Sequence, residues 1–176
     1  MHTNVILIGM PGAGKSTVGV LLAKQLQMDY ADTDILIQRR EGRRLQEIIA
    51  AVGLDGFCDV EARHILALRL RHTVIATGGS VVYRGAAMAH LQAMGRIAYL
   101  ETPPPVLAQR LGDLAVRGVV LRPGQGLEDL YRERDALYRR FADLTVACDA
   151  LSAEQVNRKL AGMLVRRETC NDANTC

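Results

Sequence analysis

Short apolar runs along the chain alternate with longer stretches in which apolar residues recur every three or four positions. The runs predict strands at residues 5–8, 28–31, 73–76, 96–100 and 144–147. Most of these runs are apolar throughout, as is typical of strands buried on both faces of a parallel sheet. Helical spacing predicts helices at 16–27, 34–40, 44–51, 59–70, 85–94, 127–141 and 152–166, and a further helix that opens at the prolines 103–105.

This alternation of strands and helices predicts an α/β fold with a sheet of about five parallel strands flanked by helices. The chain has 176 residues, a length that fits one compact domain. We expect that domain to span residues 1–168, followed by a flexible polar tail at 169–176. Residues 112–126 hold four glycines and one proline, which predicts a mobile loop.

Composition and charge exclude several classes of function. The formal net charge is only +3 and the basic residues are scattered, which argues against a nucleic acid partner. No apolar run reaches the ~18 residues of a membrane span, and the first residues lack the features of a signal peptide. The four cysteines show no CxxC spacing, so neither a zinc site nor a disulfide framework is indicated. We therefore expect a monomer in the cytoplasm with no membrane partner.

The segment GMPGAGKS at residues 9–16 matches the pattern G-x-x-x-x-G-K-[ST] between a predicted strand and a predicted helix. Glycines in such a loop let successive backbone N–H groups converge on phosphate oxygens, and the helix N-terminus adds positive potential. We expect Lys15 to reach the β and γ phosphates and the Ser16 hydroxyl to ligate Mg²⁺. The sequence therefore predicts a site for a nucleoside triphosphate.

Polar and glycine residues follow two further strands. Asp32 and Asp34 come after the second strand, where one carboxylate would hold Mg²⁺ through water and the other would accept a hydroxyl proton. The alternative is a solvated turn with an aspartate that caps the next helix. Gly78 and Gly79 follow the third strand, where they either let another molecule approach the backbone closely or only form a turn.

Arginines are concentrated after residue 109. Most of them are expected on a solvated helix face. Arg122 lies in the glycine-rich loop, and an arginine on such a lid can close over the transferring phosphate and neutralise its charge. Arg134, one turn before Tyr138, either anchors an anionic acceptor or belongs to the solvated face.

Taken in order, these motifs resemble the shikimate kinase family, small P-loop kinases that phosphorylate a ring hydroxyl of shikimate with ATP. The resemblance runs from Val5 to about Leu164. The matching segments are GMPGAGKSTVG, DTD, VIATGG, the arginines at 110 and 122, and ERDALYRRFAD at 133–143. A P-loop fold of the nucleoside-monophosphate-kinase type, with ATP and Mg²⁺ as cofactors, is what this resemblance implies.

The resemblance also implies a role for each matching residue. On the nucleotide, Arg110 would lie against the adenine and Arg122 would be the lid arginine. Ser16 and Asp32 would serve Mg²⁺, and Asp34 would meet the acceptor hydroxyl. A substrate-binding region near 33–63 and a lid near 112–124 would close over both ligands. The phosphates would be held by Gly12, Ala13, Gly14, Lys15, Ser16 and Thr17, and the acceptor would be contacted by Gly78, Gly79 and Arg134.

Three positions depart from the family pattern. Family members usually have an arginine after the phenylalanine where this chain has Cys58, and that arginine is expected to hold the shikimate carboxylate. Ser80 replaces the third of three glycines, and the lid reads Gly-Gln-Gly at 124–126 in place of an apolar residue. Losing one charge-assisted hydrogen bond costs on the order of 1.5 to 3 kcal/mol, unless Arg63 or Arg84 replaces it.

These departures bear on the acceptor. We count Cys58 and Ser80 among the acceptor-binding positions, although Cys58 is expected to be a small buried hydrophobic residue and not a catalytic or redox-active thiol. Shikimate is the expected acceptor, with shikimate 3-phosphate as the product. A smaller hydroxy acid or an amino-acid alcohol such as homoserine is the alternative, its ammonium bound by Asp34, Ser80 or Glu61. A nucleotide-binding regulator without an acceptor site is the alternative of another class, against which the presence of Asp34 and Arg134 argues.

Overall fold

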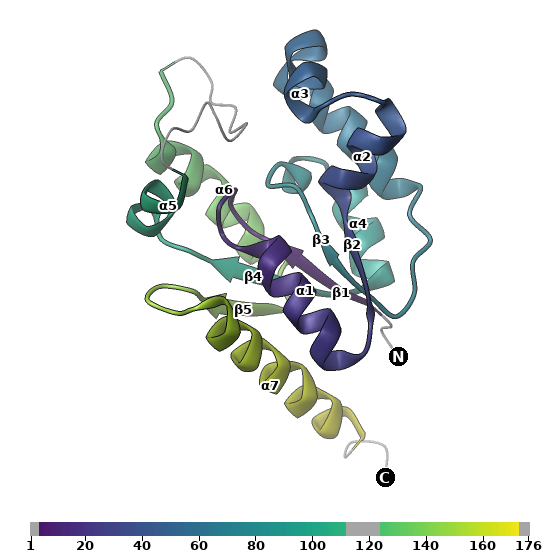
Figure 1. The fold of residues 1–176 in the computed structure, drawn as a ribbon, viewed down its shortest axis with the longest axis vertical. Helices are drawn as coiled ribbons and strands as arrows, with labels where there is room; N and C mark the ends of the chain where they lie inside the picture. Colours follow the sequence, from purple (N-terminus) through teal and green to yellow (C-terminus); the bar gives the residue numbers. More distant parts are fainter. Residues whose placement is uncertain (1–3, 112–123, 173–176) are drawn as a thin grey trace.

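Five parallel strands form one central sheet in the structure, a computed structural model that describes residues 4–111 and 124–172 (Figure 1). Their order across the sheet is β2-β3-β1-β4-β5, and every neighbouring pair is parallel. The α/β class and the five-stranded sheet expected from the sequence are therefore confirmed. The strands are β1 (Asn4–Ile8), β2 (Asp29–Asp32), β3 (Thr73–Ala76), β4 (Gly95–Glu101) and β5 (Leu144–Ala147).

The two central strands show why continuous apolar runs become parallel strands. Every residue of β1 and of β3 is buried, and Val5 lies in register with Val74. The one polar side chain in β1, Asn4, donates hydrogen bonds to the carbonyl oxygens of Leu70 at 2.9 Å and Met94 at 3.0 Å. Burial on both faces requires helices on both sides of the sheet.

Helices cover both faces and also rise beyond one edge of the sheet. In Figure 1, α1 and α7 lie on one face, α4 and α6 lie on the other, and α2 and α3 stand beyond the ends of β2 and β3. Among the described residues, no helix is both long enough and apolar enough to cross a membrane. The helices are α1 (Lys15–Leu26), α2 (Thr33–Glu41), α3 (Leu45–Leu66), α4 (Gly85–Met94), α5 (Pro104–Leu111), α6 (Leu127–Phe141) and α7 (Ala153–Asp172), with a 3₁₀ turn at Val81–Tyr83.

The structure differs from the sequence expectation at three places. Two helical parts meet at Gly53 within α3, as expected, because the φ of 73° and ψ of 175° of this glycine are non-helical, but the second part begins directly after Gly53 and ends at Leu66, where 59–70 was expected. Helix α7 continues to Asp172, where a frayed tail was expected from residue 169. The 3₁₀ turn after β3 was not expected, because three residues are too few to show a periodicity.

Candidate active site

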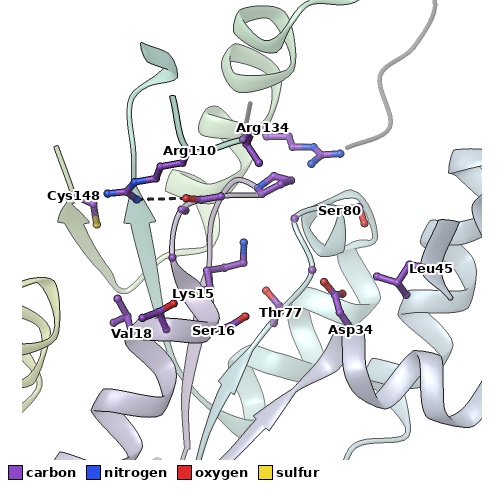
Figure 2. A pocket seen from close by; sticks show the side chains of 18 of the residues that line it. Lys15, Ser16, Val18, Asp34, Leu45, Thr77, Ser80, Arg110, Arg134 and Cys148 are labelled. Carbon is purple, nitrogen blue, oxygen red and sulfur yellow. Dashed lines mark hydrogen bonds between the residues drawn. The ribbon is translucent and has the colours of Figure 1, made fainter. Parts of the chain in front are cut away.

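A cavity of about 730 Å³ lies over the carboxyl ends of the strands, where ligands bind in open α/β sheets. In Figure 2, two walls face each other across this cavity. One, the Arg110 wall, consists of Val18, Arg110 and Cys148, and the other, the Asp34 wall, consists of Asp34, Leu45, Thr77 and Ser80. Lys15 and Ser16 project between them. The cavity thus has room for two ligands, one on each side of Lys15.

The loop between β1 and α1 forms the floor of the cavity. Gly12 and Gly14 have φ angles of +80° and +91°, in the left-handed region that favours glycine. A Cβ atom at Gly12 would also lie only 2.9 Å from the Cδ2 atom of Leu111. This tight loop leads directly into the N-terminus of α1, where backbone N–H groups without intrahelical partners are available to a phosphate.

Lys15 is buried at the start of α1, with 8% of its surface exposed. Its Nζ atom donates hydrogen bonds to the carbonyl oxygens of Gly9 at 2.7 Å and Met10 at 2.8 Å. Burial lowers the pKa of Lys15 to about 8, although the nearby Asp34 carboxylate opposes this shift. Because these hydrogen-bond partners are carbonyl oxygens and not carboxylates, the Lys15 ammonium is available to an anion that enters the cavity.

Asp32 lies at the end of β2 and accepts hydrogen bonds at both of its carboxylate oxygens. Its Oδ1 atom accepts a hydrogen bond from the backbone N–H of Asp34 at 3.0 Å and so caps α2. Its Oδ2 atom accepts a hydrogen bond from the Ser16 hydroxyl at 2.7 Å. The capping role that was the alternative interpretation of Asp32 is therefore present, and Asp32 also contacts Ser16, the other residue expected to serve Mg²⁺.

Asp34 lies in the first turn of α2 and lines the cavity. Burial raises the pKa of Asp34 to about 6, while Lys15 acts to lower it and Asp32 to raise it. A carboxylate whose pKa lies this close to neutrality is suited to accept a proton from a bound hydroxyl group. Asp34 can therefore act as a general base at this wall.

The loop after β3 approaches the two carboxyl groups too closely for any side chain. A Cβ atom at Gly78 would collide with Glu61 and would lie 2.8 Å from the Oδ1 atom of Asp34. A Cβ atom at Gly79 would lie 2.8 Å from the Pro11 ring. The two glycines are thus required for close packing and are more than a turn signal.

Arg134 is buried on α6, with 4% of its surface exposed, and also lines the cavity. Its Nε atom donates to the hydroxyl oxygen of Tyr83 at 3.1 Å, and its guanidinium lies 5.1 Å from the centre of the same ring. The next turn of α6 is fixed by Tyr138, whose hydroxyl donates to the carbonyl oxygen of Gly79 at 2.6 Å. Arg134 therefore does not lie on a solvated helix face. Its guanidinium presents a fixed cation to the cavity.

The side chains of Ser80 and Glu61 form a buried hydrogen-bonded pair that the sequence analysis did not predict. The Ser80 hydroxyl donates to the Oε2 atom of Glu61 at 2.6 Å, and Glu61 is 1% exposed. Burial raises the pKa of Glu61 to about 7, although the hydrogen bond from Ser80 lowers it. The available signal was an acidic residue on the otherwise apolar inner face of α3, between Phe57 and Ile65.

The Arg110 wall holds residues from the end of β5 that sequence reasoning missed. Arg110 donates a hydrogen bond to the carbonyl oxygen of Gly12 at 3.4 Å. Cys148, Leu151 and Ala153 line the cavity beside it. These residues could have been predicted from the parallel sheet alone, because the loop after β5 leaves the sheet at the same carboxyl edge as the P-loop.

Cys58 is 3% exposed and does not line the main cavity. It lines a smaller cavity of about 290 Å³ together with Leu54, Asp55, Tyr83 and Arg84, and Leu54 is shared with the main cavity. Burial raises the pKa of the Cys58 thiol. Cys58 is therefore a buried thiol one residue layer behind the cavity, as the alternative interpretation expected.

The two arginines considered as substitutes for a cation at position 58 lie in different surroundings. Arg63 is largely exposed and pairs with Glu41 at 2.7 Å. Arg84 pairs with Asp55 and Asp59, each at 2.7 Å, and faces the smaller cavity. Neither lines the main cavity. The expected lid at 112–124 and Arg122 lie outside the described residues, except for Gly124.

Comparison with known proteins identifies the family. The family model of shikimate kinase matches residues 11–164. Shikimate kinase 1 of Sodalis glossinidius is 38% identical over 165 residues, which cover 92% of this chain and 95% of that protein. Shikimate kinase of Aromatoleum aromaticum is 42% identical over 147 residues, 81% of this chain and 83% of that protein.

Solved structures agree with the sequence relatives. Shikimate kinase from Acinetobacter baumannii in complex with shikimate superposes with a TM-score of 0.85 and 30% identity, and the match covers 94% of both chains. Shikimate kinase from Aquifex aeolicus superposes with a TM-score of 0.77 and 28% identity over 93% of this chain and 98% of the other. With its P-loop, its cavity and these relatives, the chain belongs to the shikimate kinase family.

Proposed function

We propose that this chain transfers the γ-phosphoryl group of ATP to a ring hydroxyl of shikimate and forms ADP and shikimate 3-phosphate. The observation that carries this proposal is the arrangement of one cavity, in which the P-loop lies between the Arg110 wall and the Asp34 wall. ATP would lie along the Arg110 wall with its phosphates on the P-loop. The acceptor would lie against Asp34, Gly79 and Arg134.

Phosphoryl transfer needs positioning and charge stabilisation more than covalent chemistry by the protein. The acceptor oxygen forms the new bond to the γ phosphorus, the bond from that phosphorus to the β–γ bridging oxygen breaks, and ADP leaves. Asp34 takes the proton of the attacking hydroxyl. Lys15 exchanges its carbonyl partners for phosphate oxygens and neutralises the charge that develops there.

The residues present also fit Mg²⁺, which the family implies as a cofactor. Hard oxygen donors suit this ion, and the Ser16 hydroxyl and the Asp32 carboxylate lie within 2.7 Å of each other beside the P-loop. These two groups would hold the ion, Asp32 through water. When bound, Mg²⁺ supplies charge neutralisation at the β and γ phosphates.

The acceptor side matches an acid that carries several hydroxyl groups. Arg134 offers a fixed cation for a carboxylate, and Asp34 offers an acceptor for a hydroxyl proton. The segment 33–63, which contains α2 and most of α3, contributes Asp34, Leu45 and Phe57 to the cavity. This segment is therefore proposed as the substrate-binding region.

An acceptor panel tests the proposal directly. The protein is incubated with ATP, Mg²⁺ and shikimate, homoserine, gluconate or a nucleoside monophosphate, and ADP formation is followed. ADP formation with shikimate at rates far above the other acceptors is expected, and Lys15→Ala is expected to abolish it by removing the phosphate-binding cation. Turnover of another acceptor without shikimate turnover would contradict the substrate, and ATP binding without any turnover would favour the regulator.

We propose that the chain works as a monomer. We also propose a cytoplasmic location, where ATP is available. Analytical ultracentrifugation at assay concentration and fractionation of cells that express the protein would test these two statements.

A further inference from the structure

Ser80 is the one hydroxyl on the Asp34 wall whose proton is directed to a buried carboxylate. Its Oγ atom donates to Oε2 of Glu61 at 2.6 Å, and the same serine lines the main cavity. A serine hydroxyl has one proton and two lone pairs. With its proton given to Glu61, the oxygen has only lone pairs left for a ligand in the cavity.

The backbone at this position accepts a serine without strain. Ser80 has φ of −92° and ψ of −8°, values open to any residue. Glycine is therefore not required at this point of the loop, and the serine side chain can line the wall without backbone strain. The buried Glu61 below it has a second oxygen, Oε1, with no hydrogen-bond partner among the described residues.

We propose that Glu61 orients the Ser80 hydroxyl so that its oxygen accepts a hydrogen bond from a ring hydroxyl of the acceptor that is not phosphorylated. Ser80 thereby selects a hydroxyl group at this position and disfavours a carboxylate, whose oxygens would meet lone pairs next to a buried acid. The acceptor's own carboxylate is directed toward Arg134. This inference rests on the proposed phosphorylation of shikimate.

Glu61 acts as a positioning residue in this scheme, because it reaches the substrate only through Ser80. Three charged groups and one hydroxyl face it: Lys15 from α1, Asp34 from α2, Arg134 from α6, and the Ser80 hydroxyl at the start of the 3₁₀ turn. When Glu61 is ionised, Ser80 donates to it. When Glu61 gains a proton, that proton is donated to Ser80, and the serine proton turns toward the cavity, so that the substrate hydroxyl must accept the hydrogen bond in place of donating it.

The first experiment combines a protein change with a substrate change. Steady-state kinetics are measured for the unaltered protein and for Ser80→Ala with shikimate and with its 4-deoxy and 5-deoxy analogues. Loss of one neutral hydrogen bond is expected to raise the shikimate KM of Ser80→Ala by about 5- to 10-fold. With one of the two analogues, Ser80→Ala is expected to cause no further change. The KM for ATP is expected to stay the same.

A matched control uses the other serine that donates to a glutamate. The Ser152 hydroxyl donates to Oε2 of Glu154 at 2.7 Å, but both residues are exposed and neither lines the cavity. Ser152→Ala is therefore expected to leave both KM values unchanged.

The second experiment tests the orienting role of Glu61 by pH. Because burial raises the pKa of Glu61 to about 7, the shikimate KM of the unaltered protein is expected to rise as pH falls below that value. Glu61→Gln keeps an amide oxygen that accepts from Ser80 but cannot titrate. The rise of the shikimate KM below pH 7 is therefore expected to vanish in Glu61→Gln, while the shikimate KM at pH 8 is expected to equal that of the unaltered protein.

The outcomes separate this inference from the proposed function. Equal losses on Ser80→Ala with shikimate and with both analogues, or a Glu61→Gln profile identical to that of the unaltered protein, would overturn the inference and leave shikimate phosphorylation intact. Absence of shikimate turnover in the unaltered protein would overturn both.

Discussion

At the scale of single residues, the buried carboxyl groups of Asp34 and Glu61 differ in what they can reach. Asp34 lines the cavity, whereas Glu61 is covered by Gly78 and Ser80. A proton acceptor must be ionised to work, and burial raises the pKa of Asp34 to about 6. We therefore expect kcat to rise with pH through about 6 and then to level off.

The measurement is kcat for shikimate phosphorylation between pH 5 and 8 at saturating substrates. Asp34→Asn is the companion variant, because it keeps the size of the side chain and removes its basicity. Activity in Asp34→Asn lower by about 100-fold or more at every pH is expected. A kcat that stays flat across pH 6, or an active Asp34→Asn, would contradict the role of Asp34.

Cys58 permits a second test at the residue scale. Its thiol adjoins a cavity of about 290 Å³ that shares the lining residue Leu54 with the main cavity, so an arginine has room to extend there. Cys58→Arg would place a second cation near Arg134. We expect the shikimate KM to fall by about 10-fold, as one added charge-assisted hydrogen bond implies, with the KM for ATP unchanged.

Kinetics of Cys58→Arg with both substrates supply the answer. Arg63→Ala serves as the control, since Arg63 is exposed and pairs with Glu41 away from both cavities. A shikimate KM that rises in Cys58→Arg would mean that the small cavity is part of the acceptor site as it stands.

At the scale of elements, the kink in α3 joins the two parts of the substrate-binding region. Leu45 and Ile49 line the cavity before Gly53, and Leu54 and Phe57 line it after the kink. Gly53 has φ of +73°, and a Cβ atom there would meet nothing within 4 Å. The cost of a side chain is therefore conformational and amounts to about 1–3 kcal/mol of unfolding free energy in Gly53→Ala.

The control is also a glycine-to-alanine substitution, but it is expected to have the opposite effect on stability. Gly162 lies in α7 with ordinary helical backbone and open space around it, so Gly162→Ala is expected to stabilise the protein by about 0.5–1 kcal/mol. Urea denaturation of both variants measures the difference. Equal effects of the two substitutions would show that the kink is not held at a glycine-specific conformation.

Elements differ in how far the sequence predicts them. Apolar runs and helical spacing located all five strands, and the bounds of α4 and α6 were predicted to the residue, because each element buries a continuous or periodic apolar set. Gly53 was predicted to separate two helices, and its non-helical backbone confirms this, but no feature of the sequence indicated that the second helix begins directly after it. The P-loop was predictable as a contiguous motif, whereas the pair of Ser80 and Glu61 joins residues 19 positions apart and needed the fold.

At the scale of the whole molecule, the buried acids of the site reduce stability at neutral pH. Burial raises the pKa of Glu61 from its ordinary 4.5 to about 7. Below pH 4.5 both folded and unfolded chains are protonated at this residue, and between 4.5 and 7 only the unfolded chain releases its proton. Stability is therefore lost as pH rises through this window, and the loss is complete above pH 7.

Glu61→Gln removes this penalty while it keeps an oxygen for Ser80. The variant is expected to be more stable than the unaltered protein at pH 8 by on the order of 1–3 kcal/mol, with the difference vanishing near pH 4.5. Thermal unfolding at both pH values checks the prediction. A difference that grows toward low pH would contradict the buried, proton-holding state of Glu61.

The central claim concerns the whole chain as an enzyme, and product analysis tests it most directly. The purified protein is mixed with ATP, Mg²⁺ and shikimate, and the products are identified by ³¹P NMR and mass spectrometry. We predict one shikimate 3-phosphate for each ADP formed, and no phosphorylated product from Lys15→Ala. ADP released with inorganic phosphate and unchanged shikimate would contradict the account.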